Sequence, residues 1–167
     1  MIFFDAQPFY YGDITMRVVL MRHGEAEHGR GDDARRLTAN GVAQAESQGR
    51  MLKKLGWTGT EVWHSRKVRA EETARHLAEA AGLAAVFHEQ SGLLPEDDVE
   101  DIASLLNEQV EDVIVVGHLP YMSYMASHLA AGNASSSMWQ FGTGAMLVLS
   151  RMGRGAWEVE GFYPQGL

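Results

Sequence analysis

Two arginines and two histidines follow stretches of sequence that are typical of buried strands: Arg22, His23, Arg69 and His118. Ligands of open α/β sheets bind beyond the carboxyl ends of the strands, so we expect these side chains to meet at one edge of a sheet. A pair of guanidinium groups binds a tetrahedral oxyanion such as phosphate, and its charge keeps a neighbouring imidazole neutral and nucleophilic near pH 7. The pattern therefore predicts transfer of a phosphoryl group to His23, by positioning and charge, with no metal and no other cofactor required.

The strands that would carry these residues are short apolar runs, and helix-forming segments separate them. The strongest strand signals lie at 17–21, 61–64 and 112–116, and weaker ones lie at 85–88, 145–149 and 157–162. Apolar periodicity and capping residues predict helices at 38–55, 67–81, 98–108 and 120–131. This alternation predicts a three-layer α/β/α sandwich with a mostly parallel sheet and an antiparallel strand at its C-terminal edge.

The composition is that of an ordinary globular protein, with 46% hydrophobic and 22% charged residues among 167. Residues 17–167 are expected to form a single domain, whereas the aromatic-rich residues 1–16 form an N-terminal arm or precede the true start. The formal charge of −8 argues against binding to nucleic acid or to an anionic membrane. Because there are no cysteines and no apolar run of spanning length, we expect a cytoplasmic protein; the oligomeric state is left open.

The segment Arg22-His23-Gly24-Glu25 resembles the signature of the histidine phosphatase superfamily, which is also called phosphoglycerate-mutase-like. Three further segments follow in the family's order: RLTANG at 36–41, SRKVRAEETA at 65–74 and GHLP at 117–120. The last is similar to the second-histidine motif of the short SixA-like phosphohistidine phosphatases. The resemblance runs from about residue 17 to residue 149 and implies the phosphoglycerate-mutase-like fold.

The resemblance also implies a role for each matching residue. His23 is the nucleophile, and Arg22 and Arg69 hold the oxygens of the phosphoryl group. His118 donates to the same oxygens, so its charged form is expected to be favoured. Gly24 lets the backbone approach closely behind the nucleophile and is counted among the substrate-binding residues.

Two departures from the family pattern bear on the chemistry. The position of the general acid offers only LLPEDD at 93–98, where Glu96 is the candidate; alternatively, this segment is a solvated acidic cluster with Asp98 as a helix N-cap. A weak acid favours a good leaving group, such as the imidazole of phosphohistidine. Glu72 stands where the family has Gln, and it either lowers the positive charge near Arg69 or forms an ion pair facing outward. The polar segment 28–35 is expected to be a flexible loop at the rim of the pocket.

The sequence therefore predicts a phosphatase that acts through a phosphohistidine intermediate. The expected partner is a phosphorylated protein, such as a histidine phosphotransfer domain of a phosphorelay, reached through an open and shallow pocket. One alternative is a phosphatase for small phosphate esters, which would need Glu96 as a working acid. Another is a phosphate-binding interaction module on the same fold without catalysis, which loss of turnover on replacement of His23 would exclude.

Overall fold

Six strands form one mixed sheet in the computed structural model, which describes residues 14–29, 31–134, 139–153 and 155–165. The strand order is β3-β2-β4-β1-β5-β6. The strands are β1 Ile14–Arg22, β2 Glu61–His64, β3 Val86–Glu89, β4 Val113–Gly117, β5 Met146–Met152 and β6 Ala156–Tyr163. The first four are mutually parallel, whereas β5 pairs antiparallel with both β1 and β6. The predicted fold class is confirmed, including the C-terminal hairpin.

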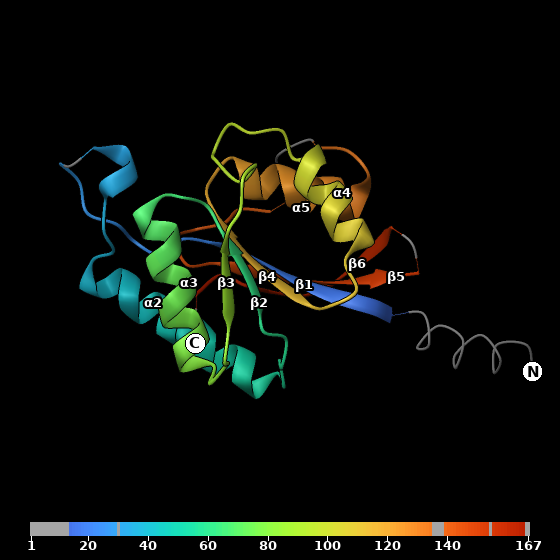
Figure 1. Cartoon of the computed structure of the whole chain (residues 1–167), viewed down its shortest axis with the longest axis horizontal. Helices are drawn as coiled ribbons and strands as arrows, with labels where there is room; N and C mark the ends of the chain where they lie inside the picture. The colour runs from blue at the N-terminus through green and yellow to red at the C-terminus, as the bar shows by residue number, and fades with distance from the viewer. Residues whose placement is uncertain (1–13, 30, 135–138, 154, 166–167) are drawn as a thin grey trace, which may run out of the picture.

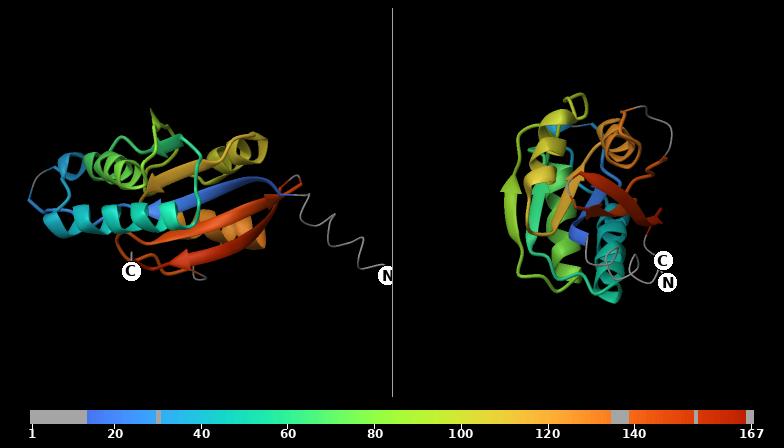
Figure 2. Two further views of the ribbon diagram at one scale, coloured as in Figure 1. Left: turned by 90° about the horizontal axis from the view of Figure 1, so that it is seen from below. Right: turned by 90° about the vertical axis from the view of Figure 1, so that its right-hand side faces the viewer.

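Helices cover both faces of this sheet, as Figure 1 and Figure 2 show. The helices are α2 Ala39–Lys54, α3 Val68–Ala80, α4 Glu100–Glu108 and α5 Tyr121–Ala131. Along β1, Val18 and Leu20 pack with α4 and α5, whereas Val19 and Met21 pack with α2 and α3. Alternate residues of a strand point to opposite faces, so a strand that is buried on both sides is apolar throughout, as this one is.

The ends of the helices follow the local chemistry of the sequence. Thr38 is the N-cap of α2, and its hydroxyl accepts a hydrogen bond from the backbone N–H of Gly41 at 3.0 Å. Gly82 follows α3 with a φ of +71°, a conformation that other residues rarely adopt. Helix α4 begins at Glu100, two residues later than predicted, and Val99 is its N-cap in place of the expected Asp98. The carboxylate of Asp98 accepts a hydrogen bond from the backbone N–H of Glu100.

Two segments differ from the sequence-based expectation. Strand β1 begins at Ile14, so residues 14–16 of the expected arm lie in the sheet; residues 1–13 lie outside the described residues. Within the segment expected to be a flexible loop, Asp32–Ala34 form a 3-10 turn, η1, whose side chains contact the candidate site. Within the described part of the chain, no helix is long and apolar enough to cross a membrane.

Candidate active site

The strand order brings the two histidines together. Strand β4 lies between β2 and β1, and Arg22 of β1 pairs with Gly117 of β4. The next residues along these two strands are His23 and His118, and the centroids of their rings are 5.2 Å apart. The backbone N–H of His23 also donates to the carbonyl of Gly117 at 2.9 Å. The expectation that both histidines stand at one edge of the sheet is therefore met.

The hydrogen bonds of His23 leave its Nε2 atom unprotonated. Nδ1 lies 2.7 Å from the carbonyl oxygen of Gly24 and must carry the proton, because a carbonyl can only accept. Nε2 then holds a lone pair, towards which the Nε–H of Arg69 points at 3.4 Å. Burial lowers the pKa of His23 to about 4, and the charges of Arg69 and Arg22 act in the same direction, although the hydrogen bond to Gly24 opposes them. His23 is therefore neutral at pH 7.

Two guanidinium groups act electrostatically on His23. Arg69, in the first turn of α3, is only 4% exposed, and Arg22 is half-buried at the end of β1. Nη1 of Arg22 donates to the carbonyl of Phe141 at 3.0 Å, whereas its buried Nε has no partner among the described residues. Burial, followed by repulsion from Arg69, lowers the pKa of Arg22. A bound oxyanion would relieve this repulsion and satisfy the free N–H group.

His118 is neutral as well, contrary to the implied preference for its charged form. Its side chain is 1% exposed, and burial lowers its pKa to about 3, with smaller contributions from His23 and Arg69. Its Nε2 lies 2.6 Å from the hydroxyl of Ser65, which directly follows β2. Its Nδ1 is buried and has no partner within the described part of the chain.

Turn η1 packs against the cations of the site. The carbonyl of Asp32 accepts from Nη1 of Arg69 at 2.7 Å, and the carboxylate of Asp32 lies 3.4 Å from Nη2. Lys67, which is buried, pairs with the carboxylates of both Asp32 and Asp33. The hydrogen bond from Lys67 holds the pKa of Asp32 well below its usual range, so Asp32 is ionised.

The glycines of two motifs, Gly24 and Gly41, pack against each other next to His23. A Cβ atom on Gly24 would lie 2.6 Å from the carbonyl oxygen of Gly41, and one on Gly41 would lie 2.0 Å from the carbonyl oxygen of Glu25. The backbone N–H of Gly24 donates to the hydroxyl of Thr73 on α3 at 3.0 Å, which fixes the turn after β1. The close approach at Gly24 is thus to helix α2. Direct contact between Gly24 and substrate stays a prediction from the resemblance.

Neither of the two acidic departures from the family pattern forms a hydrogen bond or ion pair with His23 among the described residues. Glu72 pairs with Arg36, at 2.7 Å, and accepts from the backbone N–H of Leu37, at 2.8 Å. Of the two alternatives for this residue, the structure favours the ion pair that faces outward. Glu96 is exposed in the turn between β3 and α4, and no hydrogen bond or ion pair of its side chain is recorded among the described residues. Its role as general acid stays a prediction.

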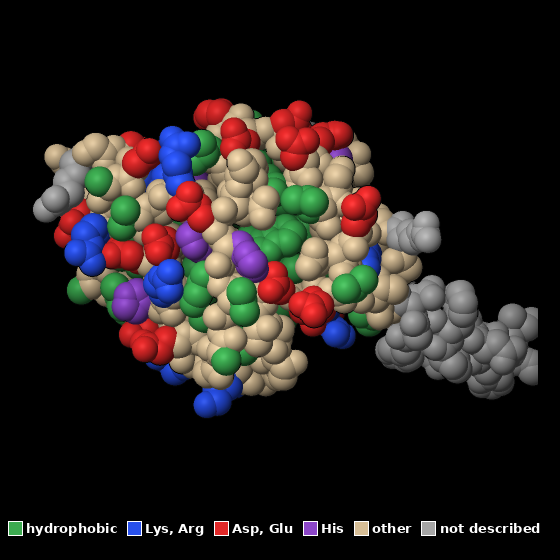
Figure 3. All heavy atoms as spheres, viewed as in Figure 1, with side chains coloured by type: hydrophobic (Ala, Val, Ile, Leu, Met, Phe, Trp, Pro, Cys, Tyr) green, Lys and Arg blue, Asp and Glu red, His purple; other side chains and the backbone are tan. Residues whose placement is uncertain are grey.

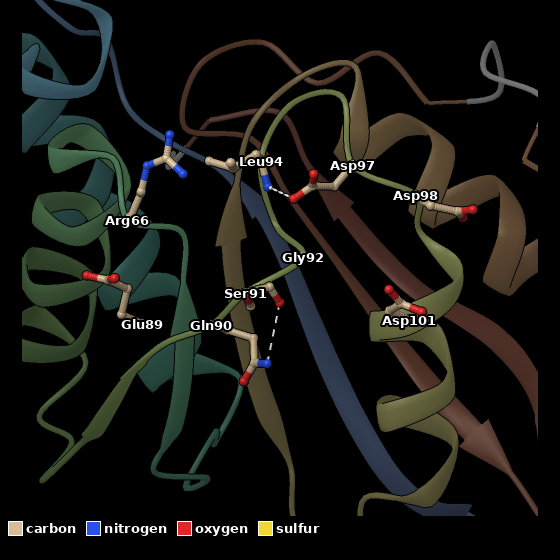
Figure 4. A pocket seen from close by; sticks show the side chains of 9 residues that line it. All are labelled: Arg66, Glu89, Gln90, Ser91, Gly92, Leu94, Asp97, Asp98 and Asp101. Carbon is tan, nitrogen blue, oxygen red and sulfur yellow. Dashed lines mark hydrogen bonds between the residues drawn. The ribbon is translucent and has the colours of Figure 1, made fainter.

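A polar pocket of about 440 Å³ borders the site through Arg66, which follows Ser65. Figure 4 shows Arg66 and Glu89 on one side of this pocket and the carboxylates of Asp97, Asp98 and Asp101 on the other. Acidic side chains also gather over α4 and the loop before it on the face shown in Figure 3. This pocket and the surface over α4 are therefore predominantly negative.

The sequence analysis gave no role to two residues that contact the site, Asp32 and Ser65. Ser65 could have been included, because it follows a strand directly and therefore stands at the same edge as His23 and His118. The contact between Asp32 and Lys67 joins residues 35 positions apart in the sequence, and no local pattern indicates it.

Comparisons with known proteins agree with this geometry. Residues 18–93 match the model of the histidine phosphatase superfamily (branch 1). The phosphohistidine phosphatase SixA of Escherichia coli K12 is 29% identical over 151 residues, which cover 86% of this chain and 93% of that protein. A SixA homolog of Haemophilus influenzae is 32% identical over 126 residues, covering 68% of this chain and 77% of the relative.

A solved structure of a protein histidine phosphatase has the same fold as this chain. The protein histidine phosphatase SixA, complexed with tungstate, superposes with a TM-score of 0.81 at 27% sequence identity. The match covers 89% of this chain and 96% of that protein. The sequence signature, the paired histidines and these relatives lead to one conclusion: the chain belongs to the histidine phosphatase superfamily and is SixA-like within it.

Proposed function

We propose that this protein is a phosphatase that removes phosphate from phosphohistidine in another protein, through a phosphohistidine intermediate on His23. The observation that supports it most is the state of His23, whose proton is held on Nδ1 by the carbonyl of Gly24. This leaves Nε2 unprotonated beside the guanidinium of Arg69, where an incoming phosphoryl group would find both a nucleophile and a counter-charge. The printed names of the relatives, which are phosphohistidine phosphatases, agree with this substrate class.

In the first step of the proposed reaction, the lone pair of His23 Nε2 attacks phosphorus in line with the leaving group. A new P–N bond forms to His23 as the P–N bond to the substrate histidine breaks. Arg22 and Arg69 hold the three phosphoryl oxygens, and the buried N–H of Arg22 gains the acceptor that it lacks within the described residues. In the second step, water attacks the phosphorus of phosphorylated His23, which restores the neutral imidazole and releases inorganic phosphate.

We favour phosphohistidine over an alkyl ester as the substrate because no carboxylate near the site is shown to supply a proton to the leaving group. An alkoxide leaving group needs a proton at the moment of bond cleavage, whereas an imidazole can leave as a neutral molecule when its second nitrogen is protonated. Asp32 is the carboxylate that contacts Arg69, and it is ionised, so it cannot supply this proton. The exposed side chain of Glu96 forms no hydrogen bond or ion pair among the described residues that would direct it towards His23.

Access to His23 has to increase when a protein-borne substrate binds. We expected an open and shallow pocket, yet His23 is only 6% exposed. The turn η1 contacts Arg69 and Lys67, and it is therefore the segment whose displacement would uncover the phosphate-binding groups. Removing phosphate from a protein surface then requires that η1 is displaced when the substrate binds.

The proposal is tested by turnover in the presence of excess chelator. A phosphohistidine-bearing phosphotransfer domain is compared with p-nitrophenyl phosphate and an alkyl phosphate, for the wild type and for His23→Asn, whose side chain is close in size to imidazole. We expect chelator-resistant release of phosphate from the protein substrate, much slower release from the alkyl ester, and none from either with the variant.

The other outcomes point to the alternatives. Rapid turnover of alkyl esters would favour a phosphatase for small phosphate esters with a working general acid. Oxyanion binding without any turnover would favour a non-catalytic interaction module. Turnover that persists in His23→Asn, or that stops on addition of chelator, would contradict the proposed mechanism.

A further inference from the structure

The hydroxyl of Ser65 makes the shortest contact of the two histidines at the site. It lies 2.6 Å from Nε2 of His118, and both residues are 1% exposed, so water does not compete for this hydrogen bond. The contact arises because β2 and β4 are neighbours in the sheet. His64 of β2 pairs with Val116 of β4, and the chain then delivers Ser65 and His118 to the same edge. His118 therefore lies between Ser65 on one side and His23 on the other.

The direction of this hydrogen bond follows from the partners of Ser65. A serine hydroxyl has one proton to donate and two lone pairs that accept. One lone pair faces the backbone N–H of Lys67, at 3.3 Å. The acceptor recorded for the proton, within the described residues, is Nε2 of His118. If His118 donated instead, both the serine proton and Nδ1 of His118 would be buried without a partner. When Ser65 donates, Nδ1 alone lacks one.

A neutral imidazole with an acceptor at Nε2 carries its proton at Nδ1. This matters because His118 is neutral at pH 7, so it has one N–H rather than the two of an imidazolium. Only one tautomer can then donate to an oxyanion from Nδ1, and the other would direct a lone pair at it. The ring of His118 stands beside that of His23, and Nδ1 is buried without a protein partner in the described part of the chain.

We propose that Ser65 is a positioning residue that selects the Nδ1–H tautomer of His118, so that this neutral histidine donates a hydrogen bond to the phosphoryl group carried by His23. The inference rests on the proposed phosphoryl transfer at His23, and it adds a residue that acts through His118 without touching the substrate. It also accounts for a phosphate-binding histidine that donates a hydrogen bond without carrying a positive charge. The specificity of the site for an oxyanion then depends on the direction of one hydrogen bond.

The tautomer is measured directly by nitrogen NMR of ¹⁵N-histidine-labelled protein, with His118 assigned by comparison with His118→Asn. We expect a protonated Nδ1 and an unprotonated Nε2 in the wild type. Ser65→Thr keeps a hydroxyl and should keep this tautomer. Ser65→Ala removes the donor, and a population protonated at Nε2 should appear. A wild type protonated at Nε2 would overturn the inference, and this result depends neither on the Ser65 variants nor on turnover.

Affinity for inorganic tungstate, measured by calorimetry on the same proteins, provides the second readout. Loss of one hydrogen bond to a charged ligand should weaken binding about tenfold in Ser65→Ala. Ser65→Thr should stay within about twofold of the wild type. Ser127→Ala, which removes a buried hydroxyl from α5 that has no partner among the described residues, is the matched control and should also stay within about twofold.

The two readouts together separate positioning from packing. Weaker tungstate binding in Ser65→Ala with an unchanged tautomer of His118 would show that Ser65 acts only structurally, and it would overturn the inference. A wild type that has the Nδ1–H tautomer and binds tungstate, but hydrolyses no phosphohistidine, would contradict the proposed function and leave the role of Ser65 in oxyanion binding supported.

Discussion

At the scale of single residues, the proposed site combines an unprotonated Nε2 on His23 with two buried nitrogen atoms that lack a partner among the described residues. His23 Nε2 is unprotonated, and the buried Nε of Arg22 and Nδ1 of His118 have no partner among the described residues. Buried donors without a partner are costly, and a phosphoryl group brings three acceptor oxygens. These nitrogen atoms are among the groups that we propose to bind the phosphoryl oxygens.

Replacement of Glu96 tests whether departure of the leaving group requires a protein acid. We expect Glu96→Gln to hydrolyse phosphohistidine within about twofold of the wild type, because the leaving imidazole does not depend on a protein acid. We expect the wild type to hydrolyse alkyl phosphates slowly, and the rate of Glu96→Gln with these esters should be no lower. Steady-state kinetics on both substrates check this. A loss of tenfold or more on the alkyl ester alone would identify Glu96 as a general acid and favour the small-ester alternative.

At the scale of the elements, the sequence predicted the strands and helices well, because each is marked by its own local pattern. Strand β2 has the predicted bounds, and Thr38 caps α2 as expected. The order of the strands carries no such local mark. That β4 lies between β1 and β2 determines which side chains touch, so the contact of Ser65 with His118 could not be read from the sequence. The segment that contains η1 was expected at the rim of the pocket, but its contact with Arg69 joins residues 37 positions apart, and no local pattern indicates it.

Turn η1 brings a carboxylate close to one of the cations of the site. Asp32 places a negative carboxylate 3.4 Å from the guanidinium of Arg69, where it opposes the approach of an anion. We expect Asp32→Asn to bind tungstate several-fold more tightly than the wild type, as measured by calorimetry. Asp33→Asn is the matched control, because Asp33 pairs with Lys67 and Arg66 and has no recorded contact with Arg69 among the described residues. Weaker binding in Asp32→Asn would show that the carboxylate supports the site.

At the scale of the whole molecule, the protein keeps two uncharged histidines in its interior beside several cations. The pKa of His23 is about 4 and that of His118 is about 3, both below the value near 6.5 of an unfolded chain. Between these values the unfolded chain binds more protons than the folded one. The free energy of unfolding therefore falls as the pH is lowered through this range.

We expect the free energy of unfolding to fall by about 2 kcal/mol for each of these histidines between pH 7 and pH 5. Chemical denaturation at the two pH values measures this difference. His23→Asn should lose a smaller amount than the wild type over the same range, since one of the two buried imidazoles is gone. Equal stability at pH 7 and pH 5 in the wild type would contradict the neutral state assigned to both histidines.

The most direct test of the account is to trap the phosphorylated protein. The wild type is mixed with a phosphohistidine donor, quenched at alkaline pH within milliseconds, and the site of phosphorylation is identified by mass spectrometry of its peptides. We predict phosphate on His23, absent from His23→Asn, with formation and decay fast enough to account for turnover. Phosphate on another residue, or turnover without any phosphorylated His23, would contradict the mechanism.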